Sequence, residues 1–155
     1  MDPSVARTIA EAAHGQGRNG RGHIDTEHLE RVAAAVPLEA RALSFVHDLV
    51  ERGDVSYEQL RAQGLTAAEA EALELLTKSE GESYELYALR IANAPGVAGR
   101  LARAVKLADL DDHLGCEAAA GRLAPPAYVW ARRHIAIAQL RHGDAGHDAV
   151  SRQAG

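Results

Sequence analysis

The sequence predicts an all-α fold, a compact bundle of about seven or eight helices. Apolar residues recur every three or four positions along most of the chain, and strict alternation of apolar and polar residues is absent. Capping residues, glycines and prolines divide the periodic stretches into separate helices. The 155 residues suit a single domain. We expect this domain over residues 1–142, followed by a flexible, polar tail over residues 143–155.

Glycine or proline ends each of the first three predicted helices. Asp2 caps a helix that runs to about residue 14, where a glycine-rich loop over residues 15–22 follows. The second helix begins at residue 25 or 26 and stops at Pro37, because proline cannot continue a helix. The third spans about residues 38–51 and is broken by Gly53.

Two capping boxes begin the second half of the bundle. Ser56 with Gln59, and Thr66 with Glu69, have the spacing at which two side chains cap one helix start reciprocally, so each pair predicts a short helix. A further helix follows Gly81 and ends at Pro95. A long helix over about residues 97–114 and a last one over about residues 125–142 complete the predicted fold.

Composition excludes several classes of function. The net charge of −5 argues against general nucleic-acid binding, which requires a basic face. No apolar run reaches the roughly 18 residues of a membrane span, and the N-terminus lacks an apolar signal core. Cys116, the single cysteine, excludes an internal disulfide and is expected to be buried. We expect a cytoplasmic protein without nucleic-acid or membrane partners; its oligomeric state stays open.

Two imidazoles and two carboxylates stand out on three of the predicted helices. They are His28, the pair His47-Asp48, and Asp109. Such a mixed nitrogen and oxygen donor set can hold one divalent metal ion. A metal ion held in this way polarises phosphate oxygens and activates water at neutral pH. The sequence therefore predicts metal-dependent chemistry on an anionic substrate.

Charged neighbours surround these candidate ligands. Glu51 follows His47 by four residues and shares its helix face, so it is expected to orient or deprotonate a water molecule at the metal. On the long helix, Lys106, Asp112 and His113 share a face with Asp109. Lys106 is expected either to pair with a phosphate or to orient Asp109.

Five short motifs occur in a fixed order within about residues 6–114. They are His14-Gly15-Gln16-Gly17-Arg18, His28-Leu29-Glu30-Arg31-Val32-Ala33, His47-Asp48-Leu49-Val50-Glu51, Leu76-Thr77-Lys78 with Tyr84 and Tyr87, and Lys106-Leu107-Ala108-Asp109. In this order they resemble the motifs of the HD-domain hydrolases of the RelA/SpoT alarmone family, particularly the small single-domain alarmone hydrolases.

The resemblance implies an HD-domain helical bundle that binds one Mn²⁺ ion through His28, His47, Asp48 and Asp109. It also implies hydrolysis of the 3′-pyrophosphate of guanosine tetra- or pentaphosphate (ppGpp or pppGpp) to GDP or GTP and pyrophosphate. Asp48 and Glu51 are the expected catalytic residues. The expected substrate contacts are Arg18, Arg21, Arg52, Lys106 and His113.

The chain departs from the family pattern at two of these positions. Arg52 stands where a second acid normally follows Glu51, and His113 stands where an asparagine follows the last ligand. Two alternatives therefore stay open beside the alarmone hydrolase. One is a related nucleotide phosphohydrolase with a different substrate. The other is a non-catalytic nucleotide-binding HD module, in which Arg52 holds the pyrophosphate instead of assisting water attack.

Overall fold

The computed structural model describes residues 1–14 and 26–143, and within these ranges it contains helices and no strand. The predicted all-α fold is confirmed. The expected tail lies, apart from Gly143, outside the described residues. The helices are α1 (Pro3–His14), α2 (Thr26–Ala35), the 3-10 turn η1 (Leu38–Ala40), α3 (Arg41–Val46), α4 (Leu49–Arg52), α5 (Tyr57–Ala62), α6 (Ala67–Leu76), α7 (Tyr84–Asn93), α8 (Gly96–Ala119) and α9 (Pro126–Arg141).

The predicted helix over residues 38–51 is not continuous. It consists of η1, α3 and α4, and the break between α3 and α4 falls on His47 and Asp48. Both residues keep right-handed helical backbone angles, but those of Asp48, φ −97° and ψ −13°, differ clearly from the values of a regular α-helix. If α3 and α4 are counted as one interrupted helix, the described ranges hold eight helices, within the predicted number.

Both predicted capping boxes are confirmed. The Ser56 hydroxyl accepts the Gln59 backbone N–H while the Gln59 side chain accepts the Ser56 N–H. Thr66 and Glu69 make the same reciprocal pair at the start of α6. Each box satisfies two N–H groups that a helix start leaves without intrahelical partners, so these short helices begin where the sequence places them.

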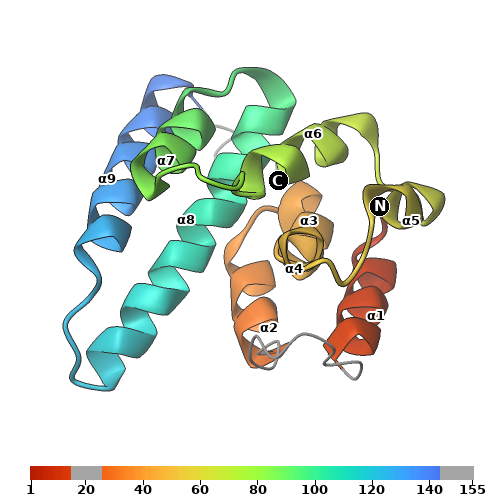
Figure 1. Cartoon of the computed structure of the whole chain (residues 1–155), viewed down its shortest axis with the longest axis horizontal. Helices are drawn as coiled ribbons and strands as arrows, with labels where there is room; N and C mark the ends of the chain where they lie inside the picture. Colours follow the sequence, from red (N-terminus) through yellow and green to blue (C-terminus); the bar gives the residue numbers. More distant parts are fainter. Residues whose placement is uncertain (15–25, 144–155) are drawn as a thin grey trace, which may run out of the picture.

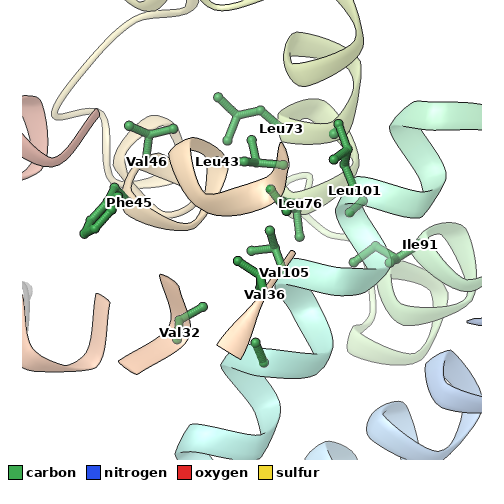
Figure 2. Close-up of a cluster of buried hydrophobic side chains, with 14 of the residues drawn as sticks. Val32, Val36, Leu43, Phe45, Val46, Leu73, Leu76, Ile91, Leu101 and Val105 are labelled. Atoms are coloured by element: carbon green, nitrogen blue, oxygen red, sulfur yellow. The ribbon is translucent and has the colours of Figure 1, made fainter. Parts of the chain in front are cut away.

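Helix α8 crosses the middle of the molecule, with α7 and α9 on one side and α1 to α5 on the other (Figure 1). Its apolar residues Leu101 and Val105 meet core side chains of α3, α6 and α7, and of the residue that follows α2; these are Leu43, Leu76, Ile91 and Val36 (Figure 2). A Cβ atom at Gly99 would overlap the Ala94 carbonyl, so glycine is required where α8 packs on the end of α7. No helix of the described ranges has the length and apolar character of a membrane span.

The far end of α8 differs from the sequence prediction. The helix continues to Ala119 instead of ending near residue 114. Cys116 lies on this extension and is exposed, so the expectation that it is buried was wrong. Asp112 and Cys116 are one turn apart, and both approach Arg31 of α2. The additional turn therefore places Cys116 beside Arg31 of α2 instead of in the core.

Arg103 fastens α7 to α8 from within the core. Arg103 is only 1% exposed. Its Nη1 donates to three backbone carbonyls at the end of α7, those of Ile91, Ala92 and Ala94. These carbonyls form the negative end of the α7 dipole, where a cation is favourable. Arg103 lies one turn before Lys106, so it also fixes the part of α8 that carries the candidate ligands.

We expect Arg103→Met to lower the free energy of unfolding by about 2–4 kcal/mol, because it leaves several buried carbonyls without their donor. Arg100→Met is a matched control on the same helix. Arg100 pairs with Glu39 in a half-exposed contact of 2.6 Å, and loss of such a pair costs about 1 kcal/mol or less. Urea denaturation measures both. Equal losses in the two variants would contradict the role of Arg103.

Candidate metal centre

Three separated segments bring their imidazoles to one carboxylate oxygen. His28 comes from α2, His47 from the break between α3 and α4, and His113 from α8. Their Nε2 atoms lie 3.3, 3.8 and 3.2 Å respectively from Asp109 Oδ1. Asp48 joins this cluster through His47, with Oδ1 at 3.3 Å from the His47 Nε2. All four predicted metal ligands are therefore neighbours.

The spacing of these atoms suits a shared cation. Two ligands with metal bonds of about 2.0–2.2 Å lie roughly 3–4.3 Å apart around one ion. The ligating atoms of His28, Asp109 and His113 all lie within 4.8 Å of one another, whereas the predicted ligands His47 and Asp48 are not part of that group. In addition, the buried His47 Nε2 makes no hydrogen bond with any described residue, although two carboxylate oxygens face it. A buried imidazole nitrogen of this kind is costly unless an ion or a donor satisfies it.

The opposite ring nitrogens fix the tautomers of the two buried histidines. His47 Nδ1 lies 2.7 Å from the Ser44 carbonyl oxygen, which can only accept, so we assign the proton to Nδ1. His28 Nδ1 lies 2.7 Å from Asp112 Oδ2, a carboxylate oxygen that accepts, so we assign a proton to this nitrogen as well. Nε2 of each ring is then the nitrogen that would coordinate an ion beside Asp109, and at neutral pH an ion would displace the proton that the raised pKa keeps on His47.

Asp112 was given no role from the sequence. It shares a helix face with Asp109, but its contact with His28 depends on how α2 packs on α8. Arg31 of α2 holds the same carboxylate, with Nε at 2.5 Å from Oδ1. The only sequence signal was the three-residue spacing of two acids on one helix, and that spacing is common on solvated helices.

Asp109 is a buried anion that neighbouring cations stabilise. Burial alone would raise its pKa, but the Lys106 charge and the neighbouring imidazoles of His113, His28 and His47 hold the pKa well below its usual value. In the opposite sense, burial would lower the pKa of His47, but the charges of Asp48 and Asp109 raise this pKa to about 9. Asp109 thus keeps its negative charge at neutral pH, as a metal ligand must.

Lys106 is directed at Asp109. Its Nζ lies 2.7 Å from Oδ2, and only 13% of the side chain is exposed. The ammonium also lies 5.9 and 5.3 Å from the ring centroids of Tyr84 and Tyr87. Of the two expected roles for Lys106, the geometry favours orientation of Asp109, since one carboxylate oxygen is occupied and the other is presented to the imidazoles.

The second expected catalytic residue, Glu51, lies on α4 and is exposed. Its Oε2 accepts the backbone N–H of Lys78 at 3.2 Å. Burial raises the pKa of the Tyr87 phenol, and the charges of Asp109, Asp48 and Glu51 raise it further. The Lys78 contact therefore holds the Glu51 carboxylate against the loop that follows α6.

Arg52 lies beside the candidate ligand Asp48. Its Nη2 is 3.9 Å from Asp48 Oδ2, which is too long for a hydrogen bond. The guanidinium is about one-third exposed and the Asp48 side chain is 43% exposed, so this edge of the cluster is open to solvent. The two other predicted arginine contacts, Arg18 and Arg21, lie outside the described residues.

Aromatic rings border the other edge of the cluster. The His113 ring lies 4.8 Å from His28 and 5.8 Å from Tyr128, and Tyr128 stacks on Tyr84 at 5.4 Å. The Tyr84 hydroxyl is buried and has no hydrogen-bond partner among the described residues. Tyr128 was not singled out from the sequence. It follows two prolines on α9, and no motif or spacing there relates it to α8.

Arg90 holds the loop that positions Glu51. Its guanidinium donates to the carbonyls of Glu74, Leu75 and Thr77 at the end of α6, and to the Glu82 carboxylate at 2.8 and 3.0 Å. The Lys78 ammonium donates to the Glu82 carbonyl at 3.1 Å. The loop over residues 77–82 is thus closed by Arg90, and its Lys78 N–H is presented to Glu51.

Comparisons with known proteins add no family. Neither the protein-family models nor the curated proteins against which the sequence was compared give a match. The similarity to the RelA/SpoT hydrolases therefore stays an interpretation of the motifs.

The Arg90–Glu82 contact that closes the loop over residues 77–82 is expected to weaken in acid. The Arg90 hydrogen bond and charge lower the pKa of Glu82 below its ordinary value of 4.5. A lowered folded-state pKa stabilises the fold above about pH 4.5 and loses that contribution as pH falls through the folded value. We expect the stability difference between the native chain and Glu82→Gln to be constant from pH 7 to 5 and to shrink below 4.5. Thermal denaturation with EDTA measures it; a difference that grows in acid would contradict the assignment.

Proposed function

We propose that this protein is a metal-dependent phosphohydrolase that removes the 3′-pyrophosphate of guanosine tetra- or pentaphosphate. The observation that carries the proposal is the meeting of His28, His47, Asp48 and Asp109, with a buried His47 Nε2 that lacks a hydrogen bond. The order of the motifs, which resembles that of the alarmone hydrolases, supports the choice of substrate.

The donor set fits a divalent ion, and the resemblance suggests Mn²⁺. When bound, the ion would polarise the phosphate oxygens and lower the pKa of water. His28 and His47 would bind it through Nε2, because their Nδ1 atoms are engaged with Asp112 and Ser44. Asp109 and Asp48 would supply the negative charge, with Lys106 orienting Asp109.

Glu51 is proposed as the base for the attacking water. Water oxygen forms a bond to the phosphorus next to the ribose, the bond from that phosphorus to the ribose 3′ oxygen breaks, and the 3′ oxygen takes a proton. Glu51 would accept the proton that the water loses. The Lys78 N–H donates to one of its oxygens and limits the orientations of the carboxylate. GDP or GTP and pyrophosphate are the products.

Arg52 is proposed to bind the pyrophosphate. A guanidinium beside Asp48, but not hydrogen-bonded to it, can turn toward a phosphate held at the cluster. The same feature supports the alternative of a nucleotide-binding module without turnover, because a cation here would hold the leaving pyrophosphate. A phosphohydrolase with a different nucleotide substrate is the other alternative.

The decisive experiment is pyrophosphate release by the purified full chain with Mn²⁺. We expect release from guanosine 3′-pyrophosphates, and none from adenosine 3′-pyrophosphates, ordinary nucleotides or phosphomonoesters. Asp48→Ala should lose metal binding and activity. Asp111→Ala, at an exposed position of α8 that pairs with Arg132, should retain both and serves as the control. Turnover in Asp48→Ala would refute the site, and tight nucleotide binding without turnover would favour the binding module.

Arg52→Ala tests the pyrophosphate contact. A hydrogen bond between charged groups contributes about 1.5–3 kcal/mol, so we expect KM to rise roughly 10- to 100-fold with little change in kcat. Arg52→Lys keeps the charge but loses the bidentate geometry, so its KM should lie between those of the native protein and Arg52→Ala. Steady-state kinetics distinguish these cases. A rate gain in Arg52→Asp would contradict the contact and would mean that an acid serves better at this position.

A further inference from the structure

We infer that His113 is a third imidazole ligand of the proposed metal centre, which increases the preference of the centre for Co²⁺, Ni²⁺ or Zn²⁺ over Mn²⁺. The inference rests on the metal centre of the proposed function, but not on the reaction or the substrate. It changes the role of His113 from the expected substrate contact to a ligand.

The position of His113 carries this inference. Its Nε2 lies 3.2 Å from Asp109 Oδ1, closer than the Nε2 atoms of His28 and His47. Among the described residues, the group whose ligating atoms all lie within 4.8 Å of one another consists of His28, Asp109 and His113. Asp109 and His113 are four residues apart on α8, so both side chains project from the same helix face toward one point.

Ring packing holds the imidazole in this orientation. The His113 ring lies near the His28 ring, with centroids 4.8 Å apart, and near the Tyr128 ring, at 5.8 Å. One half of the side chain is exposed, with a relative exposure of 48%. Two neighbouring rings therefore restrict His113 while about half of its side chain stays exposed, as suits a ligand at the open side of a centre.

Hydrogen bonding alone does not account for the cluster. Three imidazoles approach the single oxygen Oδ1 of Asp109, and Lys106 already occupies Oδ2. One carboxylate oxygen offers about two acceptor positions, so it cannot accept from three imidazoles at once. One cation beside Oδ1 would remove this competition: His28, Asp109 and His113 are already close enough to one another to share it, and His47, 3.8 Å from Oδ1, would join them by a shift of its ring.

The number of nitrogen ligands affects which ion is preferred. Imidazole suits Zn²⁺, Ni²⁺ and Fe²⁺, whereas carboxylate and water suit Mn²⁺. A centre of three imidazoles with Asp109 and Asp48 therefore gains more affinity for the later ions than for Mn²⁺. Mn²⁺ can still occupy it, so the proposed hydrolysis and this selectivity are compatible.

The test measures ion selectivity and counts the bound imidazoles in the full chain. We compare the native protein with His113→Gln, which keeps a hydrogen-bond donor for Asp109 but removes the imidazole. Affinities for Zn²⁺, Co²⁺ and Mn²⁺ come from competition with a chelator. NMR of the Co²⁺-loaded protein gives the number of hyperfine-shifted imidazole ring systems.

We expect three shifted imidazoles in the native protein and two in His113→Gln. Loss of an outer-shell partner alone costs about 10- to 100-fold in affinity, so Zn²⁺ and Co²⁺ affinity should fall at least about tenfold, and Mn²⁺ affinity by less. Asp112→Asn is the comparator for an outer-shell residue: it should weaken all three ions similarly and retain three imidazoles. His134→Ala removes a histidine that packs on Trp130 of α9 and should change nothing.

Two results would overturn the inference alone: two shifted imidazoles in the native protein, or a His113→Gln variant that loses affinity equally for all three ions. Failure of the native protein to bind any of the ions would overturn both the inference and the proposed function. Normal metal data without nucleotide hydrolysis would contradict the proposed function and leave the ligand role of His113 supported.

Discussion

One buried carboxylate determines how this molecule is organised around its candidate site. Asp109 is 4% exposed, and an isolated charge at such depth would be severely destabilising. Lys106 and three histidines compensate it, and those histidines come from α2, the break after α3, and α8 itself. The packing of these elements and the charge state of Asp109 therefore depend on each other.

Helix α8 carries both part of the hydrophobic core and the Asp109 carboxylate. Leu101 and Val105 face the apolar interior, while Lys106 and Asp109 follow within the next turn and carry charge. Arg103 fixes the same stretch against α7. The candidate site thus stands on a well-packed helix, which is the arrangement that holds ligand atoms to within a fraction of an ångström.

Sequence signals that act within a few residues predicted the helix ends better than the contacts between side chains at the candidate metal centre. Capping boxes and prolines act within a few residues, so the starts of α5 and α6 followed from the sequence alone. The partner of His28, by contrast, is Asp112, 84 residues away, and only the packing of α2 on α8 joins them. The break at His47 could not be predicted either, because the apolar residues Phe45, Val46, Leu49 and Val50 keep the helical spacing across it.

The pairing of Lys106 with one oxygen of Asp109 has a consequence for the denticity of that carboxylate. With Oδ2 held at 2.7 Å by the ammonium, Asp109 can offer an ion only its other oxygen. Calcium sites commonly use carboxylates that chelate through both oxygens and need six to eight donors in all. A lysine that never touches the ion would in this way disfavour large, oxygen-rich coordination shells and reserve room for solvent beside a smaller cation.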